Sequence, residues 1–210
     1  AGCWHSHCTV TSWSNLERIL APEPDGERPE AWEPSTLAGV VDPNAGKVHY
    51  LIDGLIPRGE LSIFAATWKA GKTLAFYRLL LDYLTGRAVF GKFRVPEPGR
   101  VLAFQLEMPN QEDERRFRRL ALGAGIYPEE VVGFVESGRL ALYNRPPLFL
   151  KDERGRSALF QLVEKHKPDL VFLDSLLAAF AGVDINDNSL VRQLFSIAFS
   201  PLTSRGITIA

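Results

Sequence analysis

The residues with the clearest chemical potential lie in one short loop, Ala66-Thr67-Trp68-Lys69-Ala70-Gly71-Lys72-Thr73. In a loop of this type, successive backbone N–H groups point inward and hold phosphate oxygens. The lysine of such a loop reaches the β- and γ-phosphates, and the hydroxyl after it ligates Mg²⁺. The loop, together with the following Leu74, therefore predicts a nucleotide site in which Lys72 contacts phosphate and Thr73 contacts the metal.

The sequence on either side of the loop is suited to position it. The apolar run 61–65 predicts a buried strand, and the apolar spacing over 74–84 predicts a helix that ends at Gly86. A loop between a strand and a helix N-terminus is the setting of a phosphate site, which disfavours a chance Gly-Lys-Thr. One position departs from G-x-x-x-x-G-K-[ST]: the first glycine is Ala66, and alanine tolerates a positive φ poorly.

Two acidic residues come at the ends of apolar runs that predict buried strands. Asp174 follows the run 170–173, which is typical of a Walker B strand whose carboxylate holds Mg²⁺. Glu107 follows the run 101–106, and we expect this strand to lie beside the strand that precedes the loop. Since residue 175 is serine, no glutamate adjacent to Asp174 can activate water, and Glu107 is the candidate general base. The alternative is that Glu107 belongs to the acidic start of a helix over 110–124.

Length and composition restrict the class of protein. The 210 residues, 46% of them hydrophobic, suit one α/β domain with an appendage. A net charge of −1 gives no global basic field for nucleic acid, so any such contact would come from a local patch or an assembly. No apolar stretch approaches the roughly 20 residues of a membrane span, and no signal-peptide pattern opens the chain. We therefore expect a cytoplasmic protein with no membrane partner.

The first 46 residues differ from the rest. Residues 1–20 contain Cys3, His5 and Cys8, which could supply ligands to Zn²⁺ in a longer protein. This cluster resembles the second knuckle of the zinc ribbon in DNA primases; the alternative is a tail with two free thiols. Residues 21–46 are rich in proline and acids and predict a linker, so the main domain is expected over 47–210. Because the chain lacks an initial methionine and stops inside the apolar run 207–210, we expect a C-terminally truncated fragment.

The remaining patterns predict ordinary elements. Acids precede arginines in the helix over 110–124, which suits its dipole and a solvated face; phosphate contact by these arginines is the alternative. Further apolar patterns predict a strand near 48–52, a strand over 139–143, a helix over 157–167, a helix over 190–204 capped by Asn188 or Asp187, and a strand from 207.

Taken together, residues 50–210 resemble the RecA-like P-loop ATPases of the RepA type, replicative helicases of plasmids and phages. The resemblance rests on residues 55–61 leading into Lys69-Ala70-Gly71-Lys72-Thr73, the run ending at Glu107, Asp174-Ser175, and Asp187-Asn188 before a long helix. It implies a mostly parallel sheet flanked by helices, Mg-ATP as cofactor and Glu107 as the catalytic base. It also implies a ring, a hexamer in such proteins, that moves on single-stranded DNA, here as the helicase part of a primase–helicase.

Two other functions are compatible with the same residues. Ala66 and Trp68 in the loop favour a nucleotide-gated binding module or loader with little hydrolysis. A recombination ATPase like RecA, or a signalling ATPase like KaiC, is the third candidate. The truncation would remove the sensor and the arginine finger that the resemblance implies.

Overall fold

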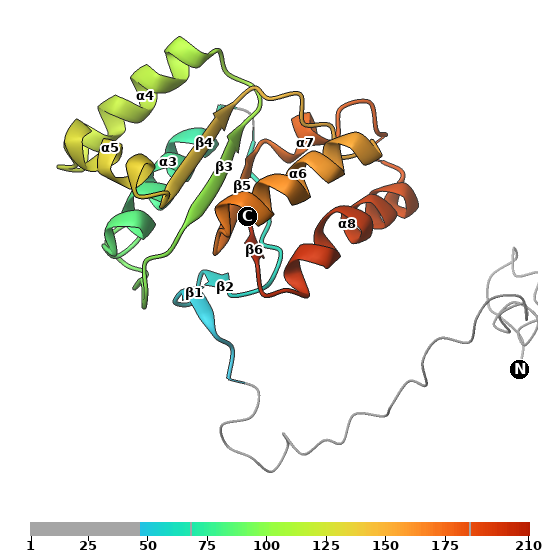
Figure 1. Cartoon of the computed structure of the whole chain (residues 1–210), viewed down its shortest axis with the longest axis horizontal. Helices are drawn as coiled ribbons and strands as arrows, with labels where there is room; N and C mark the ends of the chain where they lie inside the picture. Colours follow the sequence, from blue (N-terminus) through green and yellow to red (C-terminus); the bar gives the residue numbers. More distant parts are fainter. Residues whose placement is uncertain (1–46, 68, 185) are drawn as a thin grey trace, which may run out of the picture. The chain divides into compact units, whose positions relative to one another are not determined.

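A parallel four-stranded sheet forms the centre of the described part of the chain (Figure 1). The computed structural model describes residues 47–67, 69–184 and 186–210. The strand order is β4-β3-β5-β6. These strands are β3 (Val101–Gln105), β4 (Leu140–Asn144), β5 (Leu170–Asp174) and β6 (Thr208–Ile209). The helices are α3 (Lys72–Thr85), α4 (Asn110–Gly123), α5 (Pro128–Glu136), α6 (Glu153–His166), α7 (Leu176–Ala179) and α8 (Asn188–Thr203).

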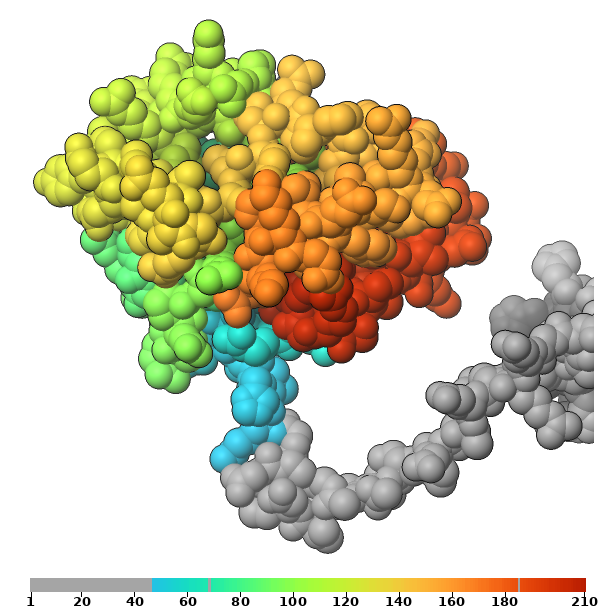
Figure 2. Space-filling view, viewed as in Figure 1, coloured from blue at the N-terminus to red at the C-terminus, as the bar shows by residue number. Residues whose placement is uncertain are grey.

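The sheet separates two apolar clusters, because successive side chains of a strand point to opposite faces. In β3, Val101 and Ala103 join the cluster that contains α3 and α4, while Leu102 and Phe104 join the cluster that contains α6 and α8. Figure 2 shows α4 and α5 gathered on one side and α6 and α8 on the other. The described residues therefore form a helix–sheet–helix sandwich. This confirms the predicted α/β class with a parallel sheet flanked by helices.

The segment before the loop is less regular than predicted. Its backbone pairs with β6 at Leu61, through a bridge to Ile209, and the Ser62 amide donates to the Ile209 carbonyl over 2.8 Å. Residues 62–65 are not part of a strand, and Ile63 and Phe64 are 58% and 47% exposed. The prediction of a buried strand over 61–65 is therefore wrong beyond Leu61, because the parallel neighbour β6 pairs with only the first two residues of the run.

The strand order also corrects the predicted position of β3. We expected β3 to lie beside the segment that precedes the loop, but β5 and β6 lie between them. β3 pairs with β4 and β5 in register, so that Gln105 lies opposite Asn144 on one side and Asp174 on the other. The ends of β3 and β5 are thus direct neighbours, which brings the regions of Glu107 and Asp174 together.

The other elements agree with the predictions except at their bounds. The strand expected near 48–52 is β1 (Tyr50–Ile52), which forms a small antiparallel pair with β2 (Ile56–Pro57). α3 begins at Lys72 and ends at Thr85, and its C-cap Gly86 has the left-handed conformation that was predicted. α6 begins four residues before the predicted helix over 157–167. Asp187 caps α8 through two backbone amides, as one of the two predicted alternatives. α5 and α7 were not predicted. Among the described residues, none of the helices is long and apolar enough to cross a membrane.

Candidate active site

The loop that follows Leu61 delivers Lys72 and Thr73 to the start of α3. Gly71 occupies the N-cap position with φ of 85°, a conformation that glycine adopts without strain. Ala66 is not among the residues with positive φ, so the alanine at the first glycine position is compatible with the backbone here. Because α3 is a helix of 14 residues whose N-terminus faces this loop, its first amides favour a bound anion.

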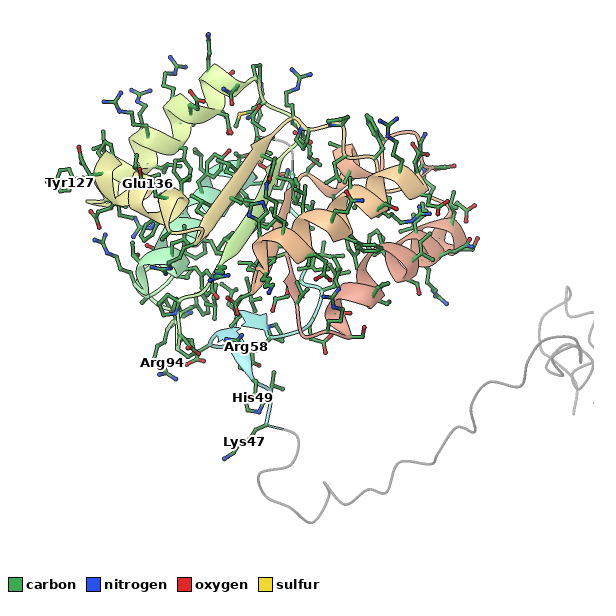
Figure 3. All side chains as sticks on the ribbon, in the orientation of Figure 1. Lys47, His49, Arg58, Arg94, Tyr127 and Glu136 are labelled. Atoms are coloured by element: carbon green, nitrogen blue, oxygen red, sulfur yellow. The ribbon has the colours of Figure 1, made fainter. Side chains whose placement is uncertain are left out.

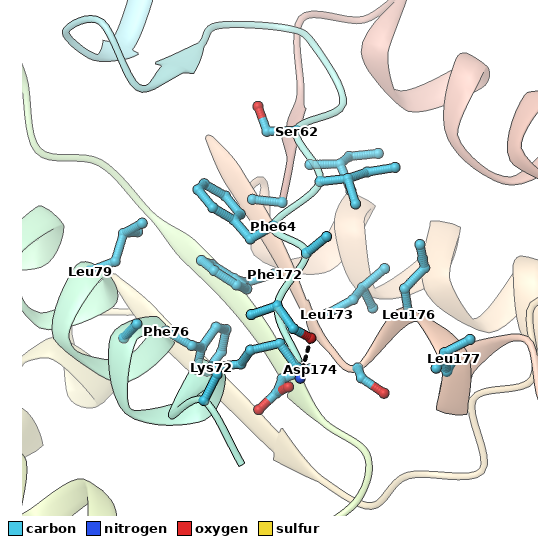
Figure 4. A pocket seen from close by; sticks show the side chains of 18 of the residues that line it. Ser62, Phe64, Lys72, Phe76, Leu79, Phe172, Leu173, Asp174, Leu176 and Leu177 are labelled. Carbon is cyan, nitrogen blue, oxygen red and sulfur yellow. Dashed lines mark hydrogen bonds between the residues drawn. The ribbon is translucent and has the colours of Figure 1, made fainter. Parts of the chain in front are cut away.

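The Lys72 side chain turns back across the loop. Its Nζ donates to the carbonyl oxygens of Ala66 and Thr67 over 3.1 and 3.2 Å. The close view shows Lys72 beside Asp174 at one end of a cavity (Figure 4). Lys72 is exposed, so its ammonium group can exchange a loop carbonyl for a phosphate oxygen. This geometry is compatible with a phosphate site that Lys72 would complete.

Asp174 ends β5 and is 9% exposed. Burial raises the pKa of its carboxyl, hydrogen bonds from Thr73 and Gln105 oppose that rise, and the charge of Glu107 adds to it. The Thr73 hydroxyl and the Asp174 carboxylate therefore form a pair of adjacent oxygen ligands, the type that Mg²⁺ prefers. A divalent cation would also relieve the cost of the buried charge, so this donor set fits the ion.

Glu107 lies in the turn between β3 and α4, outside the strand. Its carboxylate accepts a hydrogen bond from the Ser175 hydroxyl, and Ser175 directly follows Asp174. Ser175 is also the N-cap of α7, where its side chain accepts from the Ala178 amide. The structure thus brings the candidate base next to the candidate metal ligand. The connecting residue is Ser175, which the sequence analysis mentioned only because it is not a glutamate.

The cavity beside the loop has a volume of about 560 Å³. Most of its walls are apolar and come from the segment 61–66, from α3 and from the end of β5; they include Phe64, Phe76 and Phe172. The charged side chains in the wall, Lys72 and Asp174, lie close together, and Ser62 lies away from them (Figure 4). The charged groups that could bind phosphate and a metal therefore lie where the cavity borders the loop.

A second polar group lies behind the site, between α3, α4 and β4. The buried Asp113 carboxylate, 1% exposed, accepts from the Tyr77 hydroxyl and, over 2.8 Å, from Asn144 Nδ2. Burial raises the pKa of the Tyr77 hydroxyl, and its bond to Asp113 raises it further, so the hydroxyl remains a donor. Sequence reasoning missed Tyr77, Asp113, Asn144 and Gln105. For Gln105 and Asn144 the available signal was a polar residue at the last position of an otherwise apolar strand, whereas Tyr77 and Asp113 lie in helices and had no such signal.

The remaining predicted residues of the loop lie around Lys72 and Thr73. Thr67, Lys69 and Ala70 lie in the exposed loop, and Leu74 is in the first turn of α3. Trp68 and the Cys3, His5 and Cys8 cluster lie outside the described residues. Within the ranges that the structure describes, no group of three or more His, Cys, Asp or Glu side chains could hold a metal ion. The zinc prediction therefore has no support in this part of the chain.

The sequence matches a known protein family. The sequence model of a family described as an AAA domain matches residues 27–203, which include the loop, Glu107 and Asp174. No curated protein matches the chain.

Proposed function

The chain belongs to the AAA domain family, and from that premise we propose that it hydrolyses Mg-ATP at the loop of residues 66–73 and couples this to movement along single-stranded DNA. Family membership gives a P-loop ATPase of the AAA/RecA type. The coupling to DNA is the proposal, and it is supported by the resemblance to RepA-type helicases. The observation that carries hydrolysis is the placement of Glu107 beside Ser175 and Asp174.

Each residue of the site has its own role in the proposed phosphoryl transfer. The Thr73 hydroxyl and the Asp174 carboxylate would hold Mg²⁺, which would neutralise charge on the phosphate oxygens. Lys72 and the loop amides bind the β- and γ-phosphates and stabilise the charge on the transferred group. Glu107 accepts the proton of the attacking water after its carboxylate leaves the Ser175 hydroxyl.

The cofactor, the partner and the assembly follow from the same resemblance. We propose ATP as the nucleotide, single-stranded DNA as the partner and a ring, a hexamer, as the assembly. A ring would place DNA in a shared channel, which suits a chain whose net charge of −1 gives no global attraction to nucleic acid. Light scattering with and without ATP measures this assembly, and a monomer under both conditions would contradict it.

A nucleotide-gated binding module with little hydrolysis is the second candidate. The observation that favours it is the engagement of the Glu107 carboxylate with Ser175, because a base held by another group does not activate water. Both candidate functions use the same loop and the same metal ligands. They differ in whether the bound ATP is hydrolysed.

The test is ATP turnover by the full chain, with and without single-stranded DNA, beside the variant Glu107→Gln. We expect turnover that DNA stimulates and that the variant loses at least a hundredfold while it still binds ATP, as for a general base (about 10² to 10⁴). Glu136→Gln is the matched control, because Glu136 projects from the end of α5 (Figure 3). Tight ATP binding without turnover in the wild type would select the binding module. ATP turnover that single-stranded DNA does not change would indicate an ATPase without the proposed coupling.

A further inference from the structure

Three polar side chains form a row across the carboxyl edge of the sheet. Asn144, Gln105 and Asp174 are the last residues of β4, β3 and β5, and the strand registers place Gln105 opposite both of the others. Gln105 is the central member, and it is 0% exposed. A buried amide with four hydrogen-bonding positions is costly unless those positions are used, so its partners define its role.

The two ends of the Gln105 amide bind two different parts of the proposed site. Nε2 donates to Asp174 Oδ2 over 2.8 Å. Oε1 accepts from the backbone amides of Glu107 and Met108 over 2.7 and 3.1 Å. One rigid planar group therefore joins the metal-binding carboxylate on β5 to the backbone that carries the candidate base after β3.

The chemistry of these contacts specifies glutamine. The group needs a donor toward Asp174 and an acceptor toward the turn after β3, and a neutral amide offers both. Glutamate keeps the acceptor but has no donor, and it puts a second carboxyl beside Asp174. Methionine keeps the length and removes both groups. These two substitutions separate the contact with the metal ligand from the contact with the turn.

We propose that Gln105 is a positioning residue that fixes the Asp174 carboxylate and the Glu107 backbone relative to each other. This inference rests on the proposed function, since it concerns the same site. Without the amide, Asp174 loses one of the bonds that orient its oxygens, and the turn loses a single acceptor shared by two N–H groups. The described hydrogen bonds of Gln105 run to Asp174 and to the turn after β3, whereas those of Lys72 run to the carbonyls of Ala66 and Thr67, so we expect the geometry at Lys72 to be kept. Metal affinity and turnover should therefore fall, while the phosphate affinity of the loop should not.

The experiment compares the full wild-type chain with Gln105→Met, Gln105→Glu and the control Gln161→Met, whose glutamine is exposed on α6. Binding of a fluorescent ATP analogue is titrated in EDTA and then against Mg²⁺, and kcat and KM are measured at saturating Mg²⁺. For Gln105→Met we expect about a tenfold higher Mg²⁺ requirement and about a tenfold lower kcat, the lower end of the usual effect of residues that orient metal ligands. Affinity in EDTA should stay within about twofold. Gln105→Glu should share the higher Mg²⁺ requirement but keep more of the kcat, because its acceptor remains.

The outcomes separate this inference from the proposed function. A wild type that shows no Mg²⁺-dependent nucleotide binding overturns both. A wild type that binds Mg-ATP, with Gln105→Met equal to it in Mg²⁺ requirement and kcat, overturns the positioning role alone. If Gln105 had a purely structural role, both Gln105→Met and Gln105→Glu would bind the ATP analogue more weakly in EDTA and would have a lower thermal midpoint. That result would also overturn the inference. If Gln105→Met fails to fold, the near-isosteric Gln105→Glu still decides through its Mg²⁺ requirement.

Discussion

Removing the Tyr77 hydroxyl tests the buried network behind the site. In Tyr77→Phe the ring keeps its edge contact with Phe117, at 5.1 Å between centroids, while Asp113 loses one of its two side-chain donors. Asp113 is 1% exposed, so water does not replace the lost donor. A hydrogen bond to a charged group contributes roughly 1.5–3 kcal/mol, and we therefore expect the free energy of unfolding to fall by about 2 kcal/mol.

Urea unfolding followed by circular dichroism measures this loss. For a domain of this size, about 2 kcal/mol corresponds to a thermal midpoint lower by roughly 4–8 °C. Tyr127→Phe is the control, because Tyr127 is 63% exposed and projects from the start of α5 (Figure 3). In an Asp113→Leu background the same Tyr77 substitution should cost nothing, because the bond is already absent. With Asp113 intact, Tyr77→Phe could instead lower the free energy of unfolding by less than about 0.5 kcal/mol, no more than the control does. That result would refute the reasoning.

Two further substitutions probe the acids of the site. In the nucleotide-free protein with EDTA at pH 7, Asp174→Asn should raise the thermal midpoint, because burial raises the folded-state pKa of Asp174 and its charged form is disfavoured. The charged form of Asp174 lowers the stability of the wild type only as pH increases from the ordinary carboxyl pKa through the raised folded value. The difference in thermal midpoint between the variant and the wild type should therefore disappear below a pH of about 4. A difference that does not depend on pH would contradict this explanation. Ser175→Ala should raise DNA-independent kcat, by up to about tenfold or ~1.4 kcal/mol, because it releases the Glu107 carboxylate. Ser175→Thr retains a hydroxyl and serves as the control, and an unchanged or lower kcat in Ser175→Ala would exclude a restraining role.

The parts that sequence could predict are those with strong local signals. Apolar runs identified β3 and β5, and the polar loop ending in Gly71-Lys72-Thr73 identified the start of α3. Asp187 was one of two predicted caps for α8, and its side chain bonds backbone amides two and three residues later, within the same short segment. Such features depend on neighbours in sequence, which a reader of the sequence can see.

The parts that could not be predicted depend on pairing over long distances. Strand order decides that β5, and not the segment before the loop, lies beside β3, and no local pattern encodes that choice. The contacts of Gln105 with Asp174 and of Ser175 with Glu107 follow from this order. α5 had a visible signal that was overlooked: Pro128 at its first position, followed by two acids in the first turn.

The pairing of the loop's approach segment has a consequence for the order of folding. Glu60 and Ser62 are held by Ile209, and the Gly59 amide donates to Thr208 Oγ1, a residue 149 positions away. Contacts of such sequence separation require closure of a long loop and are typically late events in folding. The backbone ahead of the phosphate loop can therefore be anchored only after β6 has joined the sheet. Amide hydrogen exchange should show this anchor as one of the least protected parts of the domain, opening while β3 and β5 stay closed.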